Sequence, residues 1–192
     1  MCGTYKNIPN FLTLFRMAIV PILIASSFLD GRAFHFIAAG LFLLASVTDF
    51  FDGYLARLWK VQSRVGKLFD PIADKLLVAS AILILAHANV LGRYDVIPAV
   101  TILCREIFVS GLREFLAADK VPLPVNKYGK IKTGVQMTAI FLLLLGVEGP
   151  SLEPAIQDVT LSELLGKILL WVAGAMTAFS GYVYWKAGKP HI

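Results

Sequence analysis

Cysteine and histidine are scarce in this sequence. Its 192 residues include two cysteines and three histidines. Cys2 is almost terminal and Cys104 lies in an apolar stretch, so no disulfide framework is expected. His35 and His87 lie near the ends of expected spans and have no partner at metal-ligand spacing, which favours a structural role for both. The chain also has no low-complexity tract and no clear internal repeat, which argues against a solenoid.

Charged residues are also few. They make up 16% of the chain, whereas 57% of the residues are hydrophobic and soluble domains average about 45–50%. This balance indicates an all-α integral membrane protein. At about 20 residues per span, the length predicts a bundle of six transmembrane helices in one domain, residues 1–192. The net charge is +5, but no basic soluble domain is present, so a nucleic-acid partner is not expected.

Six apolar stretches are expected to span the membrane. The first two run over about 10–28 and 33–58, and the third ends near residue 90. The last three run over about 96–118, 131–147 and 164–185. Asn10 is a candidate N-cap for the first. A cleaved signal peptide is an alternative there, because residues 17–25 have its composition, but Arg16 interrupts the segment.

The basic residues fall mainly in alternate connections. If the N-terminus is inside, the inner segments hold Lys6, Arg57, Lys60, Arg64, Lys67, Lys120, Lys127, Lys130, Lys132, Lys186 and Lys189. The outer connections hold Arg32, Arg93 and an acidic loop over residues 148–163. This asymmetry predicts that both termini are cytoplasmic.

The last stretch carries two further patterns. Tyr182, Tyr184 and Trp185 are typical of an aromatic belt at a membrane interface. Gly174, Ala178 and Gly181 suit a close helix contact, either within the chain or between the subunits of a homodimer, and the sequence leaves both open.

Four aspartates interrupt two neighbouring apolar stretches: Asp49, Asp52, Asp70 and Asp74. A charge at the centre of a bilayer costs roughly 2.5–3.5 kcal/mol, so four charges need a physical reason. Asp49 and Asp52 share one helix face with Gly53 and Ala56, and Asp70 and Asp74 are one turn apart. Antiparallel helices would bring the carboxylates together, as an oxygen-ligated site for two divalent cations requires.

Structural interpretations of the same residues also exist. Gly53 and Ala56 could serve close helix packing. Asp70 followed by Pro71 could be an ordinary helix start, with Asp70 as the N-cap.

The full pattern resembles the signature of the CDP-alcohol phosphotransferase family. That signature is Asp-x-x-Asp-Gly-x-x-Ala-Arg, eight residues, then Gly, three residues, Asp, three residues and Asp. Every fixed position is matched, namely Asp49, Asp52, Gly53, Ala56, Arg57, Gly66, Asp70 and Asp74. The six-span layout also fits the family.

The resemblance implies a membrane enzyme that attacks the β-phosphoryl group of a CDP-linked lipid with an alcohol and releases CMP. Asp49, Asp52 and Asp70 would bind two divalent cations, Mg²⁺ or Mn²⁺. Asp74 would be a ligand of the second cation and the general base. The CDP-lipid would be held by Gly53, Arg57, Ser63, Asn10 and Thr13.

Other segments resemble the bacterial branch that makes phosphatidylglycerol phosphate. They are residues 7–16, 105–114 and 129–133. This implies CDP-diacylglycerol and glycerol 3-phosphate as substrates, at the cytoplasmic side of the bacterial inner membrane. Arg105, Arg113, Lys130 and Lys132 could bind the acceptor phosphate. Alternatively, Arg105 forms a structural ion pair with Asp74 or Glu106, and the two lysines only set topology.

Two other functions are left open at this point. The acceptor could instead be serine, inositol phosphate or phosphatidylglycerol. A divalent-cation transporter could also line its path with carboxylates, but the acidic residues gather toward one side of the membrane and no repeat symmetry is evident.

Overall fold

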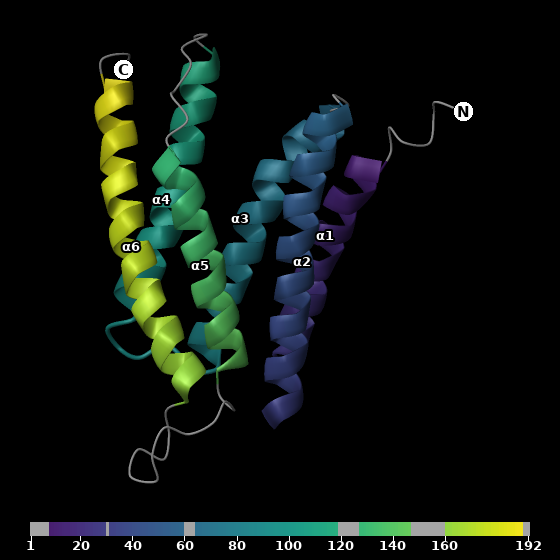
Figure 1. Ribbon diagram of the computed structural model, residues 1–192, viewed down its shortest axis with the longest axis vertical. Coiled ribbons are helices and arrows are strands. Elements are labelled where there is room, and N and C mark those ends of the chain that lie inside the picture. The colour runs from purple at the N-terminus through teal and green to yellow at the C-terminus, as the bar shows by residue number, and fades with distance from the viewer. Residues whose placement is uncertain (1–7, 30, 60–63, 119–126, 147–159, 190–192) are drawn as a thin grey trace. The chain divides into compact units, whose positions relative to one another are not determined.

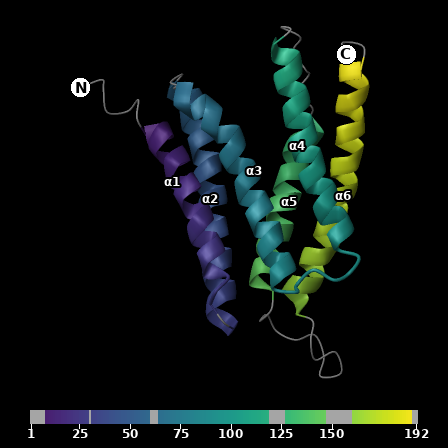
Figure 2. The same ribbon diagram turned by 180° about the vertical axis from the view of Figure 1, so that it is seen from behind.

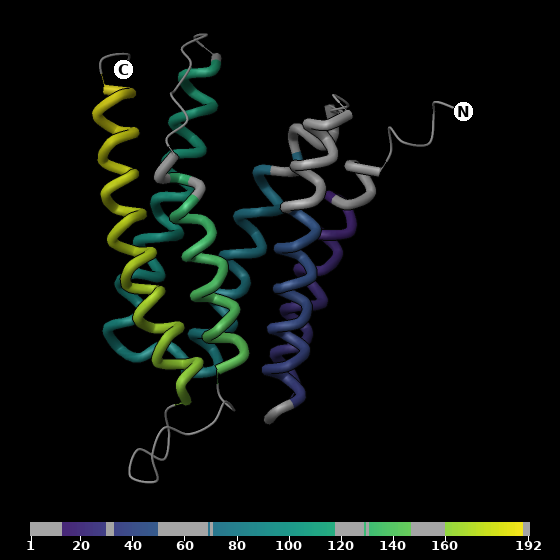
Figure 3. Tube along the Cα trace, in the orientation of Figure 1, coloured from purple at the N-terminus to yellow at the C-terminus, as the bar shows by residue number. Residues whose placement is uncertain are grey.

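The fold is known from a computed structural model, which describes residues 8–29, 31–59, 64–118, 127–146 and 160–189. Within some helices only the backbone is described, and these residues are 8–12, 31–32, 50–59, 64–68, 70, 118, 127–128 and 130. The described residues form six α-helices and no β-strand, which confirms the all-α prediction. Figure 3 draws in grey the residues outside this description. The helices fall into two compact units, Met1–Ala88 and Asn89–Ile192.

Unit 1 contains α1 (Ile8–Ser26), α2 (Gly31–Trp59) and α3 (Arg64–His87). The helix α1 packs against both α2 and α3, and these two also touch each other. Figures 1 and 2 show α2 ending and α3 beginning at the same end of this unit. The buried side chains are mainly small or aliphatic, among them Leu23, Ala38, Ala45, Ala73 and Leu77. The two segments of the aspartate motif are therefore on neighbouring antiparallel helices.

Unit 2 contains α4 (Val96–Ala118), α5 (Lys127–Leu145) and α6 (Leu161–Gly188). The helix α6 packs against both of the others. Thr160 caps α6 by accepting a hydrogen bond from the Glu163 amide, which satisfies one of the unpaired amides at the helix start. Asp95, just before α4, accepts a hydrogen bond of 3.0 Å from the Trp171 indole on α6.

Glycines set the distance between α4 and α6. A Cβ atom on Gly174 would lie 2.6 Å from the Cβ atom of Pro98, and one on Gly181 would lie 3.1 Å from Cγ of Arg105. Gly188 approaches Leu112 in the same way. The small-residue face therefore serves a contact within the chain. Ala178 does not belong to it, since its side chain is exposed.

One expected helix start is wrong, and an alternative start is not found. The helix α1 begins at Ile8, so Asn10 lies inside its first turn and is not the N-cap. The helix α3 begins at Arg64, so Pro71 lies inside it and Asp70 does not cap it. A proline inside a helix lacks the amide hydrogen for the bond to the preceding turn. The helix nevertheless continues, and Lys75 donates a hydrogen bond of 2.6 Å to the Pro71 carbonyl.

One described helix, α6, is long and apolar enough by length and composition to cross a membrane. Shorter apolar segments are present at Thr13–Ser26, Ala33–Asp49 and Ile131–Leu145. The charges that interrupt the other helices include those of the aspartate motif and of Arg105, Glu106 and Arg113 on α4. The charged residues that shorten these apolar segments are thus largely the candidate functional residues.

Candidate functional site

The aspartate motif lies on continuous helix in both segments. Asp49, Asp52 and Arg57 are within α2, and Asp70 and Asp74 are within α3. The spacing of Asp49 and Asp52 therefore places both positions on one helix face, as predicted. The side chains described among these are those of Asp49 and Asp74, and both are partly buried.

Asp49 is held by an arginine from the first helix. Arg16 Nη1 lies 2.5 Å from Asp49 Oδ1, and the Arg16 side chain is 1% exposed whereas that of Asp49 is 43% exposed. Thr13, one turn before Arg16 on α1, is also buried. The ion pair ties α1 to the first aspartate of the motif, which places the expected CDP-lipid residue Thr13 in the same part of unit 1.

The donor set on α2 and α3 suits a hard divalent cation. Such cations prefer carboxylate oxygens, and two contacting helices supply four carboxylates. A carboxylate has two oxygens, so Asp49 can pair with Arg16 through Oδ1 and still bind a cation through the other oxygen. Within the described side chains no group of three or more candidate ligands is assembled. Asp52 and Asp70 lie outside those side chains, so the expected ligand set is untested.

Replacing Arg16 by methionine should destabilise unit 1. The change leaves the carboxylate of Asp49 without its buried ion-pair partner, and loss of such a charged contact costs about 1.5–3 kcal/mol. We expect a lower midpoint of thermal unfolding in detergent. Arg93→Met is the matched control, because Arg93 is exposed in the connection before α4. Equal midpoints for Arg16→Met and the unmodified chain would contradict the structural role of the pair.

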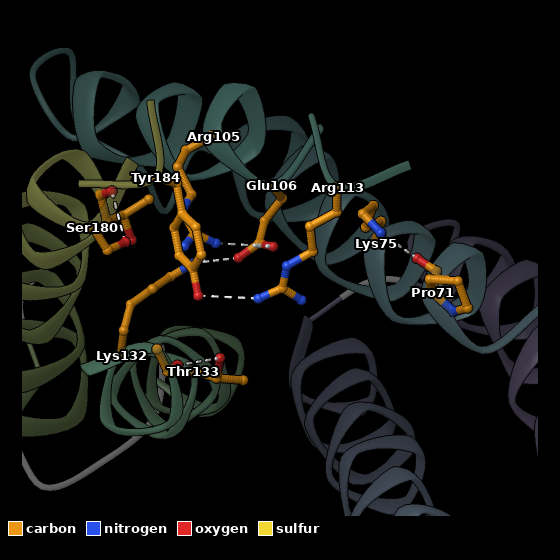
Figure 4. A network of polar contacts seen from close by, with 11 residues as sticks. Pro71, Lys75, Arg105, Glu106, Arg113, Lys132, Thr133, Ser180 and Tyr184 are labelled. Carbon is orange, nitrogen blue, oxygen red and sulfur yellow. Dashed lines mark hydrogen bonds and ion pairs between the residues drawn. The ribbon is translucent and has the colours of Figure 1, made fainter. Parts of the chain in front are cut away.

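Unit 2 gathers a separate group of charged side chains. Lys132 on α5 forms an ion pair with Glu106 on α4, and Arg105 Nη1 lies 3.6 Å from the other carboxylate oxygen of Glu106. The side chains of Lys132 and Arg105 are 2% and 12% exposed. Figure 4 shows both cations directed at this single carboxylate. The group has more positive than negative charge, as a site for an anion requires.

Arg113 joins this group through Tyr184. Its Nη2 donates a hydrogen bond of 3.0 Å to the Tyr184 hydroxyl. The guanidinium carbons of Arg105 and Arg113 lie 5.4 Å and 5.3 Å from the centre of the Tyr184 ring. The structure therefore brings together Arg105, Arg113 and Lys132, three of the four residues expected to bind the acceptor phosphate. The ion pair of Arg105 with Glu106, one of the two structural partners considered for Arg105, is also found.

Several expected site residues are outside the described side chains. Ser63 lies in an undescribed connection, and only the helical backbone is described for Asn10, Asp52, Gly53, Arg57, Asp70 and Lys130. Their roles stay predictions.

Sequence reasoning missed two members of the group in unit 2. Tyr184 was assigned to an interfacial belt, but its side chain is buried, unlike those of Tyr182 and Trp185. Its spacing from Gly181 and Gly188, three and four residues away, could have placed it on the face that meets α4. Glu106 was considered only as a partner of Arg105. Its contact with Lys132, 26 residues later, carries no sequence signal.

Comparison with known proteins agrees with this chemistry. A family model described as CDP-alcohol phosphatidyltransferase matches residues 6–179. A protein of Rickettsia typhi is 44% identical over 187 residues, covering 97% of this chain and 99% of the relative. A protein of Rickettsia felis is 42% identical, covering 97% of each chain, and one of Pectobacterium atrosepticum is 36% identical, covering 95% of each.

All three relatives are named CDP-diacylglycerol–glycerol-3-phosphate 3-phosphatidyltransferase. The family match extends over the aspartate motif, the Arg16–Asp49 pair and the ion pairs that Glu106 forms with Arg105 and Lys132. The protein therefore belongs to the CDP-alcohol phosphatidyltransferase family of enzymes, as the motif predicted.

Proposed function

We propose that the enzyme transfers the phosphatidyl group of CDP-diacylglycerol to glycerol 3-phosphate, with phosphatidylglycerol phosphate and CMP as products. The observation that carries this is the near full-length similarity to relatives named for that reaction. The buried cations of unit 2 support it, because an acceptor that carries a phosphate needs positive groups and serine does not.

The proposed reaction is a displacement at phosphorus. The acceptor hydroxyl oxygen forms a bond to the β-phosphorus, the bond from that phosphorus to the oxygen bridging to CMP breaks, and CMP leaves. Asp74 accepts the proton of the hydroxyl. Bound at Asp49, Asp52, Asp70 and Asp74, two Mg²⁺ or Mn²⁺ ions would supply charge stabilisation for the attacking and leaving oxygens.

The other residues bind and orient the substrates. Gly53, Arg57, Ser63, Asn10 and Thr13 would hold the CDP-lipid. Arg105, Arg113, Lys130 and Lys132 would bind the acceptor phosphate, and the burial of Lys132 argues against a role limited to topology. A fixed, largely desolvated cation binds a phosphate more strongly than an exposed one.

The family model runs across both compact units, so we propose that residues 1–192 act as one functional domain. The charge asymmetry supports six spans with both termini and the active site at the cytoplasmic face of the bacterial inner membrane.

Purified protein should release CMP from CDP-diacylglycerol only when both a divalent cation and glycerol 3-phosphate are present. We expect chelation of the metal to reduce release to background, and Mg²⁺ or Mn²⁺ to restore it. Serine, inositol phosphate and phosphatidylglycerol, tested in parallel at equal concentrations, should support little release. A preference for one of these acceptors would reject the proposed substrate, and metal flux into proteoliposomes without CDP-lipid would reject the reaction.

A further inference from the structure

Tyr184 lies where the two arginines of α4 meet α6. Its side chain is 3% exposed and packs in a cluster with Val109, Leu112 and Leu116. The neighbouring Tyr182 is 63% exposed. The ring is thus fixed by the core of unit 2, while its hydroxyl reaches the polar group.

The Tyr184 ring contacts two like charges at once. Both guanidinium carbons lie within 5.5 Å of the ring centre, and Figure 4 shows the ring beside Arg105 with its hydroxyl facing Arg113. The negative face of an aromatic ring attracts a cation, which offsets part of the repulsion between the two arginines. The absence of a side chain at Gly181 allows the aliphatic part of Arg105 to lie close to α6, because a Cβ atom on Gly181 would be 3.1 Å from Arg105 Cγ.

The hydrogen bond to Tyr184 orients the Arg113 guanidinium and leaves most of its N–H donors unused. A guanidinium has five N–H donors in a planar fork, and the bond to Tyr184 uses one of them. The remaining donors stay available to an anion. Because a fork held in place loses less entropy on binding, its orientation before the ligand arrives raises affinity.

We propose that Tyr184 is a positioning residue, which holds the guanidinium groups of Arg105 and Arg113 as a preformed pair of donors for the phosphate of the acceptor. The residue acts through the arginines and has no part in the chemical step. This inference rests on the proposed function, since it concerns the binding of glycerol 3-phosphate.

The test compares Tyr184→Phe with Tyr182→Phe on the same helix. The phenylalanine at position 184 keeps the ring and its packing and removes the hydroxyl that orients Arg113. We expect the KM for glycerol 3-phosphate to rise by up to about tenfold, as the cost of immobilising one long side chain on binding predicts. The kcat, the KM for CDP-diacylglycerol and the unfolding midpoint should stay near those of the unmodified enzyme, and Tyr182→Phe should change none of them.

A second arm uses Arg113→Lys, which keeps the charge and loses the fork. The double variant Tyr184→Phe with Arg113→Lys should raise the KM no more than the larger single change, because both act on one contact. Any one of four outcomes would overturn the positioning role. For Tyr184→Phe these are an unchanged KM, a fall confined to kcat, and loss of folding. For the double variant it is an additive effect on the KM. If the unmodified enzyme itself shows no release that depends on glycerol 3-phosphate, the proposed function fails, and this inference fails with it.

Discussion

The Asp74→Asn variant is expected to fold normally and to release CMP at least about a thousandfold more slowly than the unmodified enzyme. A positioned general base contributes about 10²–10⁴ to a rate, and Asp74 is also an expected metal ligand. The amide has nearly the same size and shape as the carboxylate, so the packing of α3 should survive. The measurement is CMP release at saturating CDP-diacylglycerol, glycerol 3-phosphate and Mg²⁺, together with the unfolding midpoint.

Asp95→Asn provides the matched control for this change. Asp95 lies before α4, where it accepts hydrogen bonds from the Gly92 amide and the Trp171 indole. It is outside the aspartate motif, so the same chemical change there should leave CMP release within about twofold. Near-normal release by Asp74→Asn would show that the proton goes elsewhere.

The Glu106→Gln variant should be the most destabilising of the changes considered. It leaves Lys132 and Arg105, both largely buried, without the carboxylate that lies between them. Removing one partner of a buried ion pair costs about 3–5 kcal/mol, because the remaining charge stays desolvated. We expect a clearly lower unfolding midpoint in detergent and less folded protein.

The double variant Glu106→Gln with Lys132→Met should recover part of that loss, since it also removes a buried charge. Glu114→Gln is the control, because Glu114 is exposed on the same helix and should matter little to stability. If Glu106→Gln unfolds at the same temperature as the unmodified enzyme, the ion pair with Lys132 does not hold α4 to α5.

The helices could be predicted because long apolar stretches have few alternatives to helix. The sequence predicts the fourth stretch over 96–118, and α4 runs over Val96–Ala118. One expected start and one alternative start failed where local rules conflict with the wider fold. In the alternative, Pro71 resembles a helix start, yet α3 runs through it. Asn10 resembles an N-cap, yet α1 begins before it.

The candidate site was predictable in its residue types and less so in its contacts. The aspartates and arginines stand out because charge is costly in apolar sequence. The pairs that join them link distant positions, as in Arg16 with Asp49 and Glu106 with Lys132. Such pairs depend on which helices are neighbours and on their register, and a single sequence does not state either.

The close approach at Gly174 has a consequence for how unit 2 can respond to a ligand. Gly174 contacts the Cα and Cβ atoms of Pro98 at one end of the α4–α6 interface, and Gly188 contacts the Leu112 side chain at the other, so both ends are closely packed. Sliding either helix by one turn would drive side chains into backbone. We therefore expect the α4–α6 interface to keep its shape when an acceptor binds, so that it selects the acceptor by shape and does not adapt to it.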